Sequence, residues 1–131
     1  NFQIDIGNKS IDFLNYDEVS ALFGNLVENA AEAASKVEPE NLRFIDLSVI
    51  YRRDEHRTII TVQNSCCVKP LYDEYGVSIT SKWDKDSHGY GTKSIAKIVK
   101  KYNGKIRKSY IEADKIFCEQ IYIDNKQAVK A

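Results

Sequence analysis

The stretch "NYDEVSALFGNLVENAAEAASKVEP", residues 15–39, constrains the fold of this 131-residue chain more than any other segment. Asn15 and Glu18 stand three residues apart, like the two partners of a helix-capping box, and Pro39 can end a helix. Between them, apolar residues recur at helical spacing: Val19, Leu22, Phe23, Leu26, Val27, Ala30, Ala33, Ala34 and Val37. The pattern predicts a long amphipathic helix that buries one face against another layer.

Five shorter segments have the alternation or composition of β-strands. They are residues 2–6, 42–51, 58–64, 105–113 and 115–124. A second helix is expected from about Gly91, with one apolar face and a stop at its end: Ile95, Ile98, Val99 and Tyr102, then Asn103-Gly104. This order predicts a two-layer α/β sandwich, in which a mixed β-sheet is covered on one face by helices. We expect a single domain, residues 1–131, with a frayed tail at 125–131.

Charge and cysteine content argue against several classes of protein. Lysine plus arginine equals aspartate plus glutamate, at 19 each, so a dedicated nucleic-acid binder is not expected. The sequence contains no apolar run of about 18 residues, which is the length needed to cross a membrane as a helix. The cysteines are odd in number and two are adjacent, which argues against a disulfide scaffold and favours a reducing, cytoplasmic setting. Because the chain contains no Met, we expect it to be a fragment of a longer protein.

Polar side chains follow one line along the predicted long helix. Asn25, Asn29, Glu32 and Lys36 share a narrow stripe, with Asn29 closest to the apolar face. One interpretation is a solvated helix face. The other is a ligand site, because amide and carboxylate oxygens suit Mg²⁺ and asparagine is otherwise a poor helix former.

Asn64 is a polar residue on an otherwise apolar strand face, since it alternates with Ile60 and Val62. A buried amide needs a hydrogen-bond partner. It either bonds the nearby backbone where the strand ends, or lies at the floor of a pocket and reads the edge of a base. The segment that follows, residues 65–87, has no period and is expected to be a long loop, either functional or disordered.

The stretch "SHGYGTKSIAKIVKKYNG", residues 87–104, places two glycines at the start of the second helix. Gly89 and Gly91 can adopt positive φ and let the backbone approach a ligand, and a helix N-terminus attracts anions. Lys82 and Lys93 could add positive charge. The stretch is neither a Walker A loop nor a dinucleotide fingerprint, because GxxxxGK[ST] and a third glycine are both absent.

In this order, the three features resemble the GHKL ATPase superfamily, which includes gyrase-type topoisomerases, mismatch-repair ATPases and histidine kinases. "NLVENAAEA" (25–33) is similar to the N-box of that superfamily, and "VQNS" (62–65) stands where its G1 box lies. "HGYGTKSIAKIVKKYNG" (88–104) resembles the G2 box, and "GVSITSKWDKDSHGYG" (76–91) looks like the end of a short ATP lid. The subfamily that the chain most resembles is the quorum-sensing (Agr-like) type of sensor histidine kinase.

The resemblance implies a Bergerat fold that binds ATP with Mg²⁺ and transfers the γ-phosphoryl group to a histidine. By family analogy Asn29 is the Mg²⁺ ligand, and Asn25 is a catalytic residue at the position where other branches carry a general-base Glu. Asn64 stands where most members have an Asp that reads adenine. The other ATP-binding residues implied by the resemblance are Glu32, Lys82, His88, Gly89, Tyr90, Gly91, Thr92 and Lys93.

The resemblance also implies partners outside this chain. Neither His56 nor His88 lies in a plausible acceptor helix, so the acceptor histidine is expected on a dimerisation domain that precedes residue 1. The full-length protein would be a homodimer that passes the phosphoryl group to a response regulator in a two-component system. It would reach a bacterial membrane only through its N-terminal region, with this domain in the cytoplasm.

Two departures from the family pattern leave other functions open. Asn64 replaces the usual acid, and "NSCCV" replaces the glycines of the G1 box. A degenerate kinase-like domain that binds a protein without turning over ATP would fit both departures. A serine kinase of the anti-sigma type would need Glu at residue 25, and a purely structural α/β domain would carry the motifs by accident.

Overall fold

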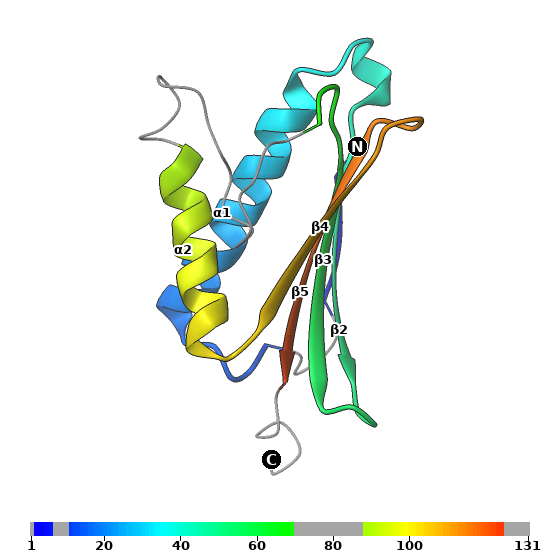
Figure 1. Ribbon diagram of the computed structural model, residues 1–131. Coiled ribbons are helices and arrows are strands. Elements are labelled where there is room, and N and C mark those ends of the chain that lie inside the picture. The colour runs from blue at the N-terminus through cyan, green and yellow to red at the C-terminus, as the bar shows by residue number, and fades with distance from the viewer. Residues whose placement is uncertain (1, 7–10, 70–87, 125–131) are drawn as a thin grey trace.

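The computed structural model describes residues 2–6, 11–69 and 88–124 of the chain. Its elements, in chain order, are β1 (Phe2–Ile6), α1 (Tyr16–Ser35), η1 (Glu40–Leu42), β2 (Ile45–Arg52), β3 (Arg57–Ser65), α2 (His88–Lys101), β4 (Lys105–Ile111) and β5 (Ile116–Asp124). The strands form one sheet in the order β1-β2-β3-β5-β4. β1 is parallel to β2, and every other neighbouring pair is antiparallel. Both helices lie on the same face of this sheet (Figure 1), which confirms the predicted two-layer sandwich.

α1 confirms the predicted capping box. The side chain of Asn15 accepts a hydrogen bond from the Glu18 backbone N–H at 2.8 Å, and the Glu18 carboxylate accepts one from the Asn15 N–H at 3.0 Å. The helix ends at Ser35, short of Pro39. The buried apolar residues of the helix follow the predicted stripe: Leu22, Leu26, Ala30 and Ala34.

α2 begins at His88, earlier than the predicted start near Gly91. Gly91 therefore lies within the helix instead of preceding it, and its φ is not positive. Glycine normally costs a helix interior about 1 kcal/mol, so its presence here needs another reason, which is the close approach of α1 described below. The predicted stop is confirmed: Asn103 adopts a left-handed φ of 55°, and the Gly104 N–H donates to the Val99 carbonyl at 2.8 Å.

The strand boundaries shift by a few residues from those predicted. The largest difference is at β2, which begins at Ile45 because Glu40–Leu42 forms a 3₁₀ turn. The inward-facing residues of both β2 and β3 are nevertheless buried. Ile45, Leu47 and Val49 are buried on β2, and the three predicted residues of β3 are buried as well: Ile60, Val62 and Asn64.

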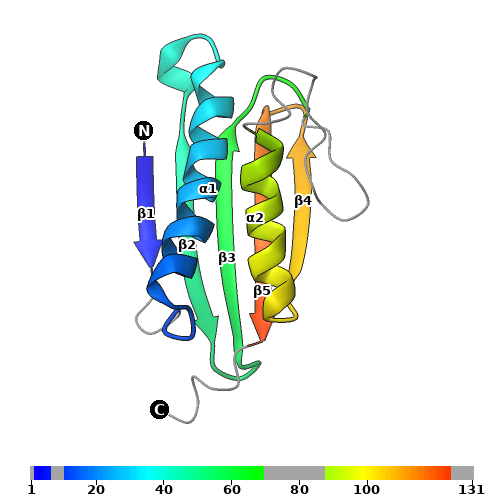
Figure 2. The ribbon, with the colours of Figure 1, turned by 90° about the vertical axis from the view of Figure 1, so that its left-hand side faces the viewer.

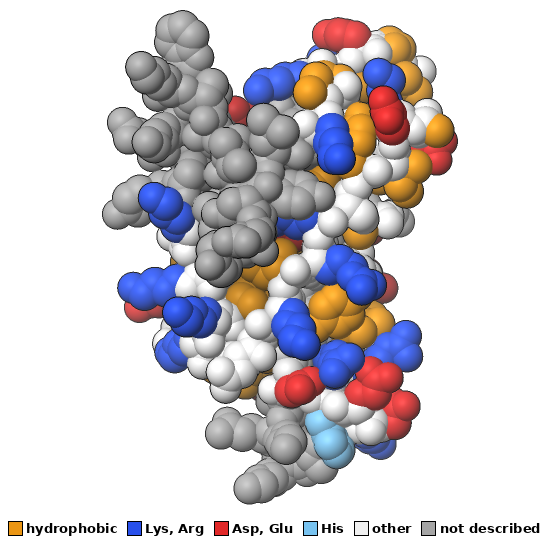
Figure 3. All heavy atoms as spheres, in the orientation of Figure 1, with side chains coloured by type: hydrophobic (Ala, Val, Ile, Leu, Met, Phe, Trp, Pro, Cys, Tyr) orange, Lys and Arg blue, Asp and Glu red, His pale blue; other side chains and the backbone are white. Residues whose placement is uncertain are grey.

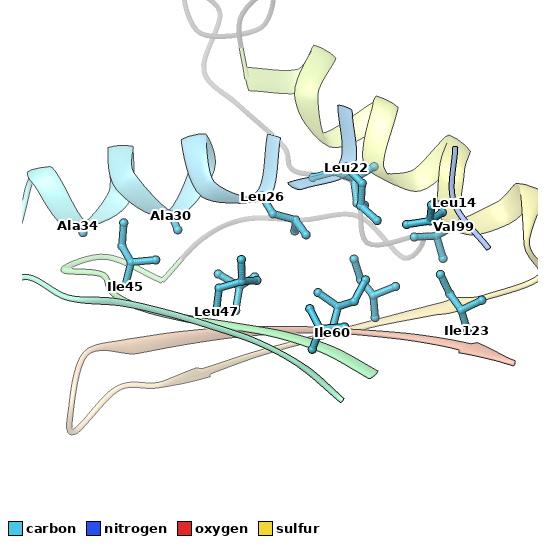
Figure 4. Close-up of a cluster of buried hydrophobic side chains, with 14 residues drawn as sticks. Leu14, Leu22, Leu26, Ala30, Ala34, Ile45, Leu47, Ile60, Val99 and Ile123 are labelled. Atoms are coloured by element: carbon cyan, nitrogen blue, oxygen red, sulfur yellow. The ribbon is translucent and has the colours of Figure 1, made fainter. Parts of the chain in front are cut away.

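The core fills the space between the helices and the sheet. Figure 4 shows Leu26 of α1 above Leu47, and the small residues Ala30 and Ala34 close to Ile45. The fully buried residues of this core include Leu22, Leu47, Ile60, Ile95, Ile121 and Ile123. β1 lies at the edge of the sheet beyond α1 (Figure 2), and its apolar residues remain about half exposed: Phe2, Ile4 and Ile6.

A polar cluster joins the start of α1 to the end of α2. The Lys101 ammonium lies 2.6 Å from the Glu18 carboxylate, and the Tyr102 hydroxyl donates to the same carboxylate. The bonds from Lys101 and then from Tyr102 lower the pKa of Glu18 from 4.5 to about 2. The Tyr102 ring also meets Phe13 edge-on, with ring centroids 5.1 Å apart. One carboxylate therefore caps α1 and fastens it to α2.

The surface seen in Figure 3 carries lysine and arginine side chains over α2 and over the sheet, with hydrophobic side chains between them. A shallow groove runs between the second half of α2 and β4, lined by Ala96, Val99, Lys100, Asn103, Gly104 and Ile106. In the described ranges, no helix combines the length and apolarity that crossing a bilayer requires. Most of the segment predicted as a loop, residues 65–87, lies outside the described residues, and Lys82 is within that part.

Candidate functional site

The elements that carry the candidate residues meet at one end of the sandwich. Figure 2 shows the end of β3, the first turn of α2 and the second half of α1 at the same end of the sheet. The polar stripe of α1, Asn64 and the G2-like stretch are far apart in the sequence. The fold brings them together, as a site built from all three requires.

Asn25 of α1 and Gly91 of α2 lie close together where the two helices pack. The Asn25 amide N–H donates to the Ala21 carbonyl at 2.6 Å, which fixes the side chain along its own helix. A methyl group added at Gly91 would lie 2.9 Å from Asn25 Oδ1, closer than carbon normally approaches. A side chain at residue 91 would therefore displace the Asn25 carboxamide, whose carbonyl oxygen lies against the first turns of α2.

The rest of the polar stripe is partly exposed, as predicted. Asn29 is half-buried one turn beyond Asn25, and no hydrogen bond holds its amide within the described part of the chain. Glu32 lies 3.9 Å from the Lys36 ammonium, in an ion pair whose lysine is 65% exposed. Asn29 therefore offers an amide oxygen in the second half of α1, while the ion pair lies further along the helix.

Asn64 is 2% exposed and faces the helices from the penultimate residue of β3. Its amide N–H donates to the Ser65 carbonyl at 3.0 Å, so the predicted bond to nearby backbone is present. The Ser65 hydroxyl in turn accepts from the Phe44 N–H at 3.0 Å. These bonds fix the amide and leave Oδ1, a hydrogen-bond acceptor, for another partner. Base recognition by Asn64 stays a prediction.

The start of α2 is only partly described. His88, Gly89 and Tyr90 have helical backbone, but their side chains lie outside the described residues. Thr92 is buried and Lys93 is exposed. The free backbone N–H groups of a helix N-terminus attract anions, and this one faces the site.

Cys66, Cys67 and Cys118 are free thiols, and burial raises the pKa of Cys66. Among the described residues, no group of three or more histidines, cysteines or carboxylates is placed to hold a metal ion. An amide-held Mg²⁺ is a different kind of site, and the oxygen of Asn29 is the donor available for it.

Sequence reasoning missed Glu119, a buried carboxylate on the helix-facing side of β5. It alternates with Phe117, Ile121 and Ile123, and this two-residue period already indicated in the sequence that Glu119 shares the apolar face of its strand. It lies one row away from Asn64, since Asn64 pairs with Phe117 and Glu119 pairs with Val62.

The fold is that of histidine kinase catalytic domains. A nucleotide-free structure of the catalytic domain of histidine kinase ThkA matches with a TM-score of 0.64 and 22% identity, covering 95% of this chain and 79% of that one. The mycobacterial sensor histidine kinase MprB matches with a TM-score of 0.62 and 13% identity, over 94% of this chain and 80% of that one. The histidine kinase domain of the blue-light activated kinase of Erythrobacter litoralis EL346 matches with a TM-score of 0.66 and 10% identity, covering 99% of this chain and 54% of that one.

These identities are low, so the likeness concerns the fold. No curated protein matches the sequence. A family model described as the GHKL domain matches residues 14–124, which includes α1, β2, β3, α2, β4 and β5. The chain therefore belongs to the GHKL domain family.

Proposed function

We propose that this domain binds ATP with Mg²⁺ and transfers the γ-phosphoryl group to a histidine on a separate dimerisation domain. The observation that carries the proposal is that the second half of α1, the end of β3 and the start of α2 lie at one end of the sandwich (Figure 2), and these elements carry Asn29, Asn64 and the G2-like stretch. Membership of the GHKL family supports it, because ATP binding is the function that these motifs share in the resemblance drawn above.

The phosphates would lie against the first turn of α2. A helix N-terminus presents free N–H groups and the positive end of the helix dipole, and both stabilise anions. Asn29 would hold Mg²⁺ through Oδ1, a hard oxygen donor that this ion accepts alongside several waters. Bound Mg²⁺ would neutralise phosphate charge, and phosphoryl transfer depends mainly on such neutralisation and on positioning.

Asn25 favours transfer to a histidine over hydrolysis. Its N–H already donates to Ala21, and an amide oxygen cannot take a proton from water at neutral pH. A histidine needs no such base on this chain, since a neutral imidazole attacks with its own lone pair. The nitrogen–phosphorus bond would form as the bond from Pγ to the β–γ bridging oxygen breaks, ADP would leave with that electron pair, and the imidazole would release its ring proton to solvent.

The acceptor would come from another domain. His56 lies in the turn between β2 and β3, at the end of the sheet away from the start of α2 (Figure 2). It cannot reach a γ-phosphate bound there. We extend the proposal to a homodimeric, membrane-linked sensor kinase of the quorum-sensing type, whose cytoplasmic catalytic domain this is and whose phosphoryl group passes to a response regulator.

Calorimetric titration with a non-hydrolysable ATP analogue tests the proposal. We expect binding that tightens with Mg²⁺, and Asn29→Ala should weaken binding in Mg²⁺ by about tenfold or more and remove most of the Mg²⁺ dependence. Asn41→Ala, an exposed asparagine in η1, is the matched control and should bind like the native domain. Absence of binding at millimolar analogue would refute the proposal in favour of a protein-binding module.

A second measurement addresses the acceptor. Incubation of the isolated domain with γ-labelled ATP should give no acid-labile phosphohistidine on this chain. Label on His56 or His88 would contradict the placement of the acceptor on another domain.

A further inference from the structure

The helix-facing side of the sheet is organised in rows across the strands. The row nearest the candidate site runs Ile45, Asn64, Phe117 and Tyr110, and the next row runs Leu47, Val62, Glu119 and Lys108. The third row is apolar throughout: Val49, Ile60, Ile121 and Ile106. Within these three rows, the polar residues lie in the two rows nearest the candidate site.

Glu119 is the exceptional member of these rows. It is 8% exposed, and within the part of the chain that the structure describes no hydrogen bond or ion pair holds its carboxylate. Burial raises the pKa of Glu119, and the charge of Lys108 on the neighbouring strand only partly offsets this. A buried carboxylate without a partner destabilises a fold, so an apolar side chain would serve the core better at this position.

Asn64 and Glu119 lie diagonally across β3 and β5. Because Asn64 pairs with Phe117, Glu119 is two residues along the partner strand on the same face. Such diagonal neighbours are about 7–8 Å apart at Cα, a distance that two polar side chains can bridge through one small group between them. One N–H of the Asn64 amide is engaged with Ser65, and the acceptors available to that group are Asn64 Oδ1 and the Glu119 carboxylate.

The chemistry of the acceptors selects the part of a nucleotide that could lie there. A carboxylate repels phosphates, which would lie instead at the start of α2. The 6-amino group of adenine carries two N–H donors, one for each acceptor. Guanine and hypoxanthine present a carbonyl oxygen at the same position, which two acceptors would repel.

We infer that Glu119 is a specificity residue of the nucleotide site, which together with Asn64 Oδ1 accepts the two N–H groups of adenine and disfavours 6-oxopurines. The inference rests on the proposed function, since it concerns the base end of the same site. It also explains how a chain with Asn in place of the usual adenine-reading acid selects its base: the carboxylate lies on β5 instead of β3.

Titration with ATP and with inosine triphosphate, which differs at C6 and the adjoining N1, tests the inference. The native domain should bind ATP about tenfold or more tightly than inosine triphosphate, because a site built to bond an amino group leaves its acceptors unpaired with the analogue. Glu119→Gln can donate to a 6-carbonyl and should reduce the preference to about threefold or less. Glu119→Leu should weaken ATP binding while leaving inosine triphosphate binding nearly unchanged.

Two controls separate the possible failures. Glu112→Gln removes an exposed carboxylate in the turn between β4 and β5 and should keep the native preference. Thermal unfolding without nucleotide should show Glu119→Gln at least as stable as the native domain, since the variant removes a buried charge whose desolvation Lys108 offsets only in part. If neither nucleotide binds the native domain, the proposed function fails. If ATP binds and Glu119→Gln keeps the full preference, only the role of Glu119 is overturned.

Discussion

The cluster of Glu18, Lys101 and Tyr102 makes a prediction about acid stability that can be worked from the structure. The pKa of Glu18 falls from 4.5 to about 2 in the folded domain, chiefly through the bond from Lys101 and then that from Tyr102. A shift of that size corresponds to about 3 kcal/mol at neutral pH. Since the Lys101 side chain is 58% exposed, solvent screens the ion pair, and we expect about 1–2 kcal/mol to be measured.

The perturbation is Glu18→Gln, which keeps an oxygen for the capping box and for Tyr102 but removes the charge. A group with a depressed pKa stabilises the fold above its unfolded pKa, and that stability is lost as pH falls through the folded value. The loss caused by Glu18→Gln should therefore be full at pH 7 and nearly full at pH 5. By pH 3 it should fall to about two-fifths of its neutral value.

Urea unfolding at pH 7, 5 and 3 provides the assay. Glu28→Gln, an exposed carboxylate on the same helix, is the control and should change the unfolding free energy by less than about 0.5 kcal/mol at each pH. A double-mutant cycle with Lys101→Met isolates the ion pair from the capping bond. An effect of Glu18→Gln that is the same at pH 3 as at pH 7, or no larger than that of Glu28→Gln, would refute the reasoning.

Three glycines give further predictions, each measured by urea or thermal unfolding. Gly91→Ala should destabilise the domain by about 1–2 kcal/mol because its methyl group would lie 2.9 Å from Asn25 Oδ1, and Asn25→Ala in the same chain should recover most of the loss. Gly104→Ala should cost about 2 kcal/mol or more, since the methyl group would lie 2.8 Å from the Tyr122 carbonyl oxygen, which belongs to the backbone and cannot turn away. Gly24→Ala, with nothing within 4 Å, should instead stabilise α1 by about 0.5–1 kcal/mol; a loss there would show that helix propensity does not govern these sites.

Local chemistry made parts of this structure predictable. The capping box of α1 depends on two residues three positions apart, and the inward position of Asn64 follows from the two-residue period of a strand. The contact between Asn25 and Gly91 could not be predicted in the same way, because it depends on how closely α1 and α2 pack. The glycine was interpreted as loop chemistry, whereas the structure gives it a packing role.

Glu119 was missed for a related reason. Its strand was predicted, but the row that it shares with Val62 and Lys108 is set by pairing between β3, β5 and β4, which no local pattern specifies. A charged residue that alternates with Phe117 and Ile121 is the available signal. It becomes informative only when the pairing shows that this face lies beside Asn64.

The two ends of the sandwich differ in how they are packed: one is stabilised by apolar and ionic contacts, and the other contains buried polar side chains beside the candidate site. Towards one end, the row that contains Ile60 and Ile121 is apolar, and Glu18 joins α1 to α2 through hydrogen bonds from Lys101 and Tyr102. At the other end, Asn64 and Glu119 replace apolar side chains, and the helices meet across a glycine. Buried polar side chains of this kind lower the stability of the nucleotide-free domain where a ligand would bind, so that end should open more readily than the end held by Glu18. Amide hydrogen exchange would show this as faster exchange at the start of α2 than at its end, with protection of the start restored by ATP and Mg²⁺ through mass action.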